Sequence, residues 1–255
     1  MSETSQSQRG TTARRVYKKA KAKTAKAKAV SNGVRTGDGW QAEKSALTRK
    51  AILEGAVRCF VREGYTKTTT AMIAAEAGVS RGAMMHHFSA RAEVMKAVVA
   101  YLHERRLDEY RELMTANDIS ENITREDIRR SVKAAWAYHN LPTFVAYQEL
   151  QSAARTDEEL GEVIGEFEKE FEKQFLSTAK TVFPQWRSIK SFQAAHDLVH
   201  FVMRGMATTY RSSNSKKRAE RIIDLVTDQL VEIYELESSP GLLGQAKLVG
   251  EKNML

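Results

Sequence analysis

Hydrophobic positions recur with the period of an α-helix along most of the chain from residue 45 onward. Ile52, Ala56, Cys59 and Phe60 stand at i, i+4, i+7 and i+8, which puts them on one face of a helix. This pattern predicts a first helix that begins at Ser45 and ends at a glycine cap, Gly64. Further helices are predicted over 71–77, 81–87, from 89 through Leu102, 125–139, 143–155, 157–182, 188–212 and 216–237.

Small polar residues, glycine and proline mark the boundaries between these helices. Ser80 can cap the helix over 81–87, and Ser89 can restart the chain into the next one. Pro142 and Pro184 separate later helices. Asn-Gly and Asp-Gly pairs occur only in the polar N-terminal stretch and never between alternating runs, so no β-hairpin is predicted. The predicted fold class is all-α.

Residues 1–44 differ in composition from the rest of the chain. They are rich in Ser, Thr, Gln, Lys and Ala and almost lack large apolar side chains, so little burial can offset the entropy of ordering the backbone. We expect a disordered basic arm that contacts nucleic acid, and a solvated arm without a partner is the alternative. Residues 238–255, which include Pro240-Gly241, are expected to form a short C-terminal tail.

The net charge of +8 is unevenly distributed along the 255 residues. Residues 1–44 hold 11 Lys and Arg against 3 acidic residues, and residues 45–106 hold 10 against 5. Residues 107–255 hold 19 against 24. This asymmetry indicates a basic N-terminal surface that meets a polyanion and an acidic body that does not. Nucleic acid and an anionic membrane surface both fit this charge pattern.

Composition excludes several classes of protein. No apolar run approaches the length of roughly 18 residues that marks a membrane span, and the charged N-terminus lacks the apolar stretch of a secretory signal. The single cysteine, Cys59, cannot form an internal disulfide and fits a reducing cytoplasm. We therefore expect a cytoplasmic protein, associated with the nucleoid when it is bound there.

Two short helices joined by Gly78-Val79-Ser80 give residues 69–88 the dimensions of a helix-turn-helix. Glycine allows the left-handed backbone of a tight turn between helices. The second helix would present its first residues to the major groove, where Arg81 can reach guanine or phosphate. Gly82 and Ala83 are small enough for close approach, and a helical glycine costs about 1 kcal/mol against alanine, so its presence favours contact over helix stability.

An ordered set of residues between 46 and 106 resembles the DNA-binding domain of the tetracycline-repressor (TetR) family. The resemblance rests on Thr68-Thr69-Thr70-x-x-Ile73-Ala74-x-x-Ala77-Gly78-Val79-Ser80-x-Gly82-x-x-x-x-His87-Phe88-x-x-Arg91, preceded by Gly64-Tyr65 at the end of the first helix. It implies a helix-turn-helix domain over 45–106 and a helical effector-binding and dimerisation domain over 107–237. It further implies a homodimeric transcriptional regulator, usually a repressor, that a small ligand releases from a palindromic operator.

The resemblance and the motif together assign the contacts with double-stranded DNA. The residues expected to face the groove or its edges are Arg81, Gly82, Ala83, Met85 and His86. Those expected to grip phosphates or to set the docking angle are Thr68, Thr69, His87 and Arg91. Met85 replaces a common tyrosine of the family, which puts one phosphate contact in doubt and offers an apolar contact to thymine. Arg91 replaces the usual lysine and keeps the charge. Ala90 replaces the expected serine, which leaves Ser89 as the capping candidate.

Aromatic, methionine and histidine side chains on the later helices are candidates for an effector pocket. They are Trp136, His139, Phe144, Tyr147, Phe171, Phe175, His196, His200 and Met203. The alternative is that most of them are plain core. His196 and His200, at i and i+4, also suit a metal, but spacing places no third ligand, so a core or pocket role is favoured and no metal or cofactor is expected.

No arrangement of carboxylates, or of serine or cysteine with histidine, supports catalysis, and Cys59 is interpreted as a structural thiol on a buried face. In the last helix, Ile222, Val226, Leu230 and Ile233 form an apolar stripe that is expected to join a partner subunit, or else to pack within its own subunit. The rival to a ligand-responsive repressor is a ligand-independent architectural DNA-binding protein that relies on its basic arm.

Overall fold

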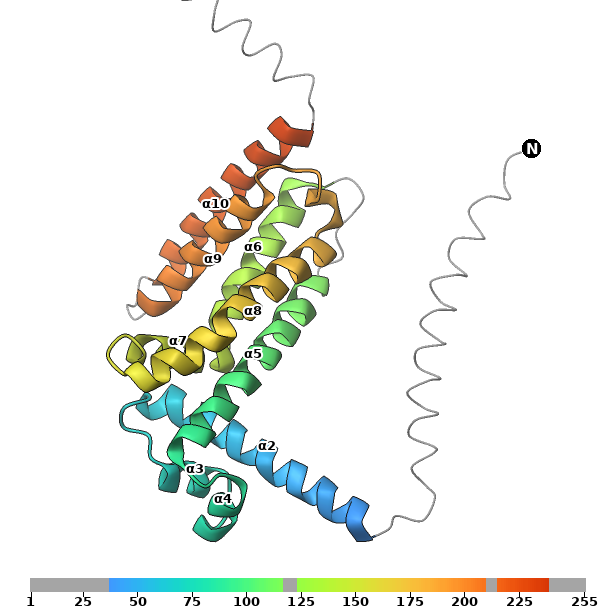
Figure 1. Ribbon diagram of the computed structural model, residues 1–255. Coiled ribbons are helices and arrows are strands. Elements are labelled where there is room, and N and C mark those ends of the chain that lie inside the picture. The colour runs from blue at the N-terminus through green and yellow to red at the C-terminus, as the bar shows by residue number, and fades with distance from the viewer. Residues whose placement is uncertain (1–36, 117–122, 210–214, 239–255) are drawn as a thin grey trace, which may run out of the picture. The chain divides into compact units, whose positions relative to one another are not determined.

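The computed structural model describes residues 37–116, 123–209 and 215–238, and every regular element in these ranges is helical (Figure 1). The elements are α2 (Gly37–Glu63), α3 (Thr70–Glu76), α4 (Arg81–His87), α5 (Arg91–Thr115), α6 (Arg125–His139), α7 (Pro142–Ala153), α8 (Glu158–Val182), the 3-10 turn η1 (Pro184–Trp186), α9 (Phe192–Thr209) and α10 (Ser215–Ser238). The all-α prediction is confirmed. None of these described helices is long and apolar enough to cross a membrane.

The chain divides into two units, residues 1–50 and 51–255. In the first unit the helical backbone of α2 already begins at Gly37, so the expectation of a disordered arm up to residue 44 is wrong for residues 37–44. This stretch contains Ala42, Glu43 and Lys44, which favour a helix. The Lys44 ammonium lies 5.2 Å from the centroid of the Trp40 ring. The rest of the predicted arm, 1–36, and the tail from 239 onward lie outside the described residues.

In the second unit two hydrophobic clusters form the core, and α5 contributes to both. The first cluster joins the end of α2, the short helices α3 and α4, and parts of α7 and α8 to Val94, Val98 and Leu102 of α5. The second joins α6, α9 and α10 to Tyr110 and Met114 of α5. The domain boundary expected at residues 106 and 107 therefore falls inside one continuous helix. Figure 1 shows α8 running beside α5 along this length.

The later helices begin close to where the sequence predicts them, because their caps are local. Thr124 caps α6 in a reciprocal capping box with Asp127. Asp157 caps α8 by accepting the backbone N–H of Leu160 at 3.0 Å. The prediction fails at α9, which starts at Phe192 rather than 188 because the chain first forms η1 after Pro184.

The apolar stripe on the last helix is buried within the chain itself. Val226 and Leu230 of the predicted stripe are buried in the second cluster, as are Val199 and Met203 of α9, and Ile222 and Ile233 are partly buried against it. The expectation that this stripe meets a partner subunit is therefore wrong for its central residues, and the alternative of packing within the subunit holds for them. The large apolar side chains that α9 and α10 leave exposed are instead Leu198, Phe201, Leu225 and Leu236.

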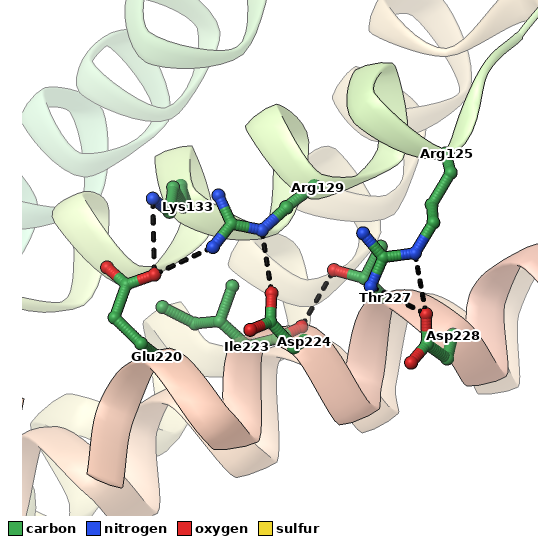
Figure 2. Close-up of polar contacts among 8 residues, drawn as sticks. All are labelled: Arg125, Arg129, Lys133, Glu220, Ile223, Asp224, Thr227 and Asp228. Carbon is green, nitrogen blue, oxygen red and sulfur yellow. Dashed lines mark hydrogen bonds and ion pairs between the residues drawn. The ribbon is translucent and has the colours of Figure 1, made fainter. Parts of the chain in front are cut away.

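Three basic residues of α6 face three acidic residues of α10 in a ladder of ion pairs (Figure 2). The paired groups are Arg125 with Asp228 at 2.7 Å, Arg129 with Asp224 at 2.7 Å and Glu220 at 2.8 Å, and Lys133 with Glu220 at 3.2 Å. Beside the ladder, the buried Thr227 hydroxyl donates to the Ile223 carbonyl. The hydrogen bond from Arg129 lowers the pKa of Asp224. Since all rungs are spaced by one helical turn, the ladder runs straight along the contact between α6 and α10.

Charge reversal across this ladder gives a test of its contribution. We expect Arg129→Glu to lower the melting temperature by a few degrees, because it faces Glu220 and Asp224 with a third negative charge. Adding Asp224→Arg should recover part of the loss in a double-mutant cycle. Arg111→Glu is the matched control, because the ion pair that Arg111 forms among the described residues is with Asp108 on its own helix. An Arg129→Glu melting temperature equal to that of the control variant would contradict a stabilising ladder.

Candidate nucleic-acid interface and effector cavity

The helices α3 and α4 are each started by a hydroxyl side chain and joined by a glycine turn. The Thr69 hydroxyl oxygen accepts the backbone N–H of Met72 at 3.2 Å, and that of Ser80 accepts the backbone N–H of Ala83 at 3.1 Å. Gly78 has a φ of 68°, the left-handed conformation that glycine adopts without strain. These contacts give residues 69–88 the predicted helix-turn-helix, and α4 has the predicted bounds, Arg81–His87.

Two arginines of α2 hold α3 in place. Arg58 donates to Glu76 Oε1 at 2.8 Å and to the Glu76 backbone carbonyl at 3.1 Å. Arg62 donates to Glu76 Oε2 at 2.8 Å. The pKa of Glu76 is lowered by the hydrogen bonds from Arg62 and then Arg58. The guanidinium groups of Arg58 and Arg62 are therefore used to hold α3 against α2 and are not available to bind a ligand.

One face of α4 is buried and the opposite face is open. Met84 and the following Phe88 pack into the first cluster. Exposed on the other side are Arg81, Gly82, Met85 and His86, with half of the Met85 surface accessible. Ala83 and His87 are half-buried at the edges of this face. Arg81 forms no ion pair within the part of the chain that the structure describes, so its guanidinium is available to an anion.

The fold itself does not require glycine at position 82. A Cβ atom built there would meet only the Ser80 hydroxyl oxygen, at 3.9 Å, and the residue has ordinary helical geometry. Glycine therefore leaves the outer surface of α4 flat without relieving any clash or strain within the chain. This is the geometry expected where another molecule approaches the backbone closely.

Two of the residues predicted to contact phosphates form hydrogen bonds within the protein. Thr68 is 1% exposed and its hydroxyl donates to the Gly64 carbonyl at 2.7 Å, so its side chain is not presented to a phosphate, and the alternative that it sets the docking angle stays a prediction. Arg91 is exposed, but its guanidinium donates to the Thr68 carbonyl at 2.6 Å and lies 5.1 Å from the centroid of the Tyr65 ring. A phosphate contact by Arg91 stays a prediction, and Thr69 is the threonine that remains exposed.

The start of α5 is capped in an unexpected way. Ala90 is the N-cap residue and makes no side-chain bond, and the Ser89 hydroxyl does not replace it. Instead, the Glu93 carboxylate reaches back and accepts the Ser89 backbone N–H at 2.8 Å. A carboxylate of the first turn thus caps the N-terminus of α5, where the helix dipole also favours a negative charge.

Polar contacts tie the helix-turn-helix to α8. The Tyr65 hydroxyl donates to Asp157 Oδ2 at 3.0 Å, while the other oxygen of Asp157 caps α8. Lys96 of α5 pairs with Glu166 of α8 at 3.0 Å. Burial raises the pKa of Tyr65, so the hydroxyl stays a donor at neutral pH. The loop that leads into α3 is therefore bonded to the first residue of a long helix of the C-terminal body.

A cavity of about 270 Å³, partly open to solvent, lies between α5, α6, α7, α8 and α9. Six of the predicted pocket residues line it: His139, Phe144, Phe171, Phe175, His196 and His200. Trp136, Tyr147 and Met203 do not, because Met203 is fully buried in the second cluster and Tyr147 lies beneath the cavity wall in the first. A second, apolar cavity of about 70 Å³ shares His196 and His200 and extends toward Trp186.

Sequence reasoning missed the polar residues of the larger cavity. Arg106, Gln151, Glu168 and Arg204 line it, and Arg204 donates to the Gln151 side chain. A signal for Arg106 exists in the sequence: it stands between Leu102 and Tyr110 at spacings of four, on the apolar stripe of α5. A charged residue on a buried stripe indicates a cavity or a partner for that charge.

The three histidines of the cavity and Tyr110 form a cluster of two hydrogen-bonded pairs, joined by the ring contact between His196 and His200. His139 Nδ1 donates to the Ala135 carbonyl at 2.7 Å, which leaves its Nε2 to accept from His200 Nδ1 at 3.3 Å. His196 Nε2 bonds to the Tyr110 hydroxyl at 3.1 Å. Burial lowers the pKa of His139 and of His196 to about 4 and that of His200 well below its usual value. The cluster is therefore neutral at pH 7.

The described residues, 37–116, 123–209 and 215–238, contain no group of three or more His, Cys, Asp or Glu side chains arranged to hold a metal ion. The ring nitrogens of His196 and His200 that have contacts are bound to Tyr110 and His139. Cys59 is fully buried and its pKa is raised, first by desolvation and then by Glu76, which fits a structural thiol.

The neutral histidine cluster predicts a loss of stability in mild acid. The unfolded chain binds protons near pH 6.5, whereas folded His139 and His196 bind them only near pH 4, so the free energy of unfolding falls as the pH drops through this window. Each of the two should contribute a slope of about 1 kcal/mol per pH unit. Urea denaturation at several pH values between 7.5 and 4.5 measures the total.

The variant His196→Asn should flatten that pH dependence, because it removes one of the titrating groups. His86→Asn is the control, since His86 is exposed on α4 and lies outside the cluster. Equal slopes for the wild-type chain and His196→Asn would count against the cluster as the source of the acid sensitivity.

Comparison with known proteins places the helix-turn-helix in a family. Residues 52–98 match the family model of bacterial regulatory proteins, tetR family. Over 62 residues the chain is 45% identical to the HTH-type transcriptional regulator TtgR of Pseudomonas putida, a match that covers 24% of this chain and 30% of TtgR. Over 189 residues it is 25% identical to the HTH-type transcriptional repressor AcnR of Corynebacterium diphtheriae, covering 72% of this chain and 92% of AcnR.

The strong sequence match thus spans less than a third of TtgR, and the fold extends the likeness further. A solved structure of a TetR-family regulator from Mesorhizobium loti aligns with a TM-score of 0.59 at 18% identity, covering 74% of this chain and 97% of that one. This alignment includes the helical C-terminal body. By its helix-turn-helix domain, the chain belongs to the tetR family of bacterial regulatory proteins.

Proposed function

We propose that this protein is a sequence-specific transcriptional repressor that leaves its operator when a small molecule occupies the cavity of the C-terminal body. The observation that carries the proposal is the open face of α4, where Arg81, Gly82, Met85 and His86 stand exposed on a helix capped by Ser80. A helix of this kind fits the major groove, where base edges carry a distinct pattern of donors and acceptors. The relatives named above are a regulator and a repressor by name.

Phosphate contacts can come from the hydroxyls that cap the two short helices. Thr69 and Ser80 use an oxygen lone pair to accept a backbone N–H, so each hydroxyl proton remains to be donated. Both residues are exposed. One cap stands at the start of α3 and the other at the start of α4, and phosphate contacts there would fix the height of α4 above the DNA backbone.

The outer face of α9 and α10 supports a homodimer. Leu198 and Phe201 of α9 and Leu225 of α10 are 40%, 69% and 57% exposed, an unusual display for large apolar side chains. A twofold dimer through this face would present two copies of α4 to two half-sites, which raises both affinity and specificity.

Release by a ligand can act through α8. This helix lines the cavity with Glu168, Phe171 and Phe175, and its capping residue Asp157 is bonded to Tyr65 at the start of the helix-turn-helix. A ligand that prefers one position of α8 would therefore favour one position of α4, and such a preference lowers operator affinity.

Selection of bound duplexes from a random pool tests the function directly. We expect the full chain to enrich a palindromic sequence and Arg81→Ala to weaken binding to it by about 10- to 100-fold, because one base or phosphate contact of the exposed guanidinium is lost. Arg111→Ala is the matched control, since Arg111 is exposed on α5 and paired with Asp108. Failure to enrich any shared sequence would refute the proposal.

Gly82→Ala separates DNA contact from folding. The new methyl group meets only the Ser80 hydroxyl oxygen at 3.9 Å, and alanine favours the helix by up to about 1 kcal/mol, so the variant should melt at a higher temperature. Its affinity for the selected duplex should nevertheless fall, because the methyl group lies on the face that meets DNA. A variant that is both more stable and unchanged in affinity would show that α4 does not approach the duplex at this residue.

A further inference from the structure

A buried cation lies in the wall of the cavity without an anion to balance it. Arg106 is 5% exposed and lines the cavity. Its guanidinium carbon lies 3.8 Å from the centroid of the Tyr147 ring and 4.0 Å from that of Phe171, so the group is held between two aromatic rings. These rings fix its position and supply some cation–π attraction, but they accept no strong hydrogen bond.

Nε and Nη1 of Arg106 find no hydrogen-bond acceptor, and the guanidinium forms no ion pair within the described part of the chain. The nearby carboxylates are engaged elsewhere. Glu109 pairs with Arg105 at 3.0 Å and accepts from Thr143. Glu168 accepts from Tyr147 and Gln151. A buried charge without hydrogen bonds is costly, so the site is incomplete as it stands.

A second donor beside the guanidinium is also without a partner. The Tyr138 hydroxyl is buried and has no acceptor. Arg106 and Tyr138 both line the cavity, and the charge of Arg106 opposes the rise in the pKa of Tyr138 that burial causes. A guanidinium edge and a phenol O–H offer their protons to the same kind of acceptor, a pair of carboxylate oxygens.

The rest of the cavity restricts what else a ligand can carry. Its walls include the apolar rings of Phe144, Phe171 and Phe175, and its outer end is lined by exposed residues such as Glu172 and Phe201. Asp197, half exposed, and Glu168 bring the acidic residues of the lining to three, and its second cation, Arg204, donates to the Gln151 side chain. A ligand with one negative charge at Arg106 and an apolar body fits these walls, whereas a second negative charge would meet the acidic residues.

From this arrangement we infer that the effector is an apolar, preferably aromatic, monocarboxylate whose carboxylate is bound by Arg106 and the Tyr138 hydroxyl. The inference rests on the proposed function, since it identifies the chemical class of the molecule that occupies the proposed effector cavity. Its carboxylate would supply the acceptors that Arg106 and Tyr138 lack, and its body would lie against the phenylalanine rings.

Matched pairs of an acid and its neutral amide test this inference on the full chain. The probes are phenylacetate, indole-3-acetate and octanoate with the corresponding amides, and benzylphosphonate as a doubly charged competitor. Calorimetric titration should show at least one carboxylate binding about 10- to 100-fold more tightly than its amide, the effect of a charged hydrogen bond in a buried site. It should also bind more tightly than benzylphosphonate and release the selected duplex.

Arg106→Met and Tyr138→Phe identify the groups responsible. Methionine keeps the length and packs well between rings, and phenylalanine removes only a hydroxyl that has no partner, so both variants should fold and bind the duplex. Arg106→Met should abolish the preference for acid over amide, and Tyr138→Phe should reduce it. Arg105→Met, one residue earlier on α5 and facing Glu109, is the control that should keep it.

The inference is overturned if no acid binds better than its amide, if the preference survives in Arg106→Met, or if benzylphosphonate binds more tightly than every carboxylate. These failures are distinguishable from failure of the proposed function. A chain that enriches no duplex fails as a repressor whatever it binds, whereas a chain that enriches a duplex but ignores carboxylates loses only the ligand class assigned here.

Discussion

The continuity of α5 is the constraint on which the other features of the molecule depend. A single helix from Arg91 to Thr115 supplies Val98 and Leu102 to one core and Tyr110 and Met114 to the other. Because a helix of this length is stiff, neither core can rotate about it without breaking packing on its own side. The helix-turn-helix and the cavity are thus both built on α5, and Arg106 lies on this helix between the residues of the two cores.

A second connection runs parallel to α5 along α8. Asp157 uses one carboxylate oxygen to cap α8 and the other to accept from Tyr65, so the geometry of a helix start and the geometry of the loop before α3 are set by the same side chain. Tyr65 in turn lies under Arg91, which holds the Thr68 carbonyl. The loop into α3 is therefore positioned by Arg91 of α5 and by the capping residue of α8, in addition to its own bond from Thr68 to the Gly64 carbonyl.

The parts of this structure that could be predicted from the sequence are those fixed by local rules. Ser80 caps α4, Gly78 turns the chain, and the bounds of α4 and α6 follow from caps and periodicity. The sequence does not decide whether Thr68 grips a phosphate or sets the docking angle, because a threonine beside a helix start looks the same whether its hydroxyl points to solvent or to the Gly64 carbonyl. The stripe on α10 was misassigned because periodicity identifies a buried face without saying which neighbour covers it.

The cavity was only half predictable for a related reason. Aromatic and histidine residues are visible as a composition, and six of them do line the cavity. The polar groups that give it chemistry, Arg106 above all, depend on which side chains lack partners after folding, and this depends on contacts between residues far apart in the sequence. Glu109 is four residues from Arg105 and three from Arg106, yet it pairs with Arg105.

The ladder between α6 and α10 has a periodic character that the apolar contacts beside it do not share. Its charges repeat every four residues on both helices, so a slide of one turn would bring Arg129 opposite Asp228 and Lys133 opposite Asp224, and two of the rungs would re-form. Only intermediate positions leave the charges unmatched. The ion pairs are therefore compatible with more than one alignment of the two helices. Packing selects among these alignments, because the slide would move Ile223 into the position of Ala219 and Leu230 into that of Val226. In this contact the spacing of the charges allows shifts of one helical turn, and the packing of the apolar side chains determines which alignment is adopted.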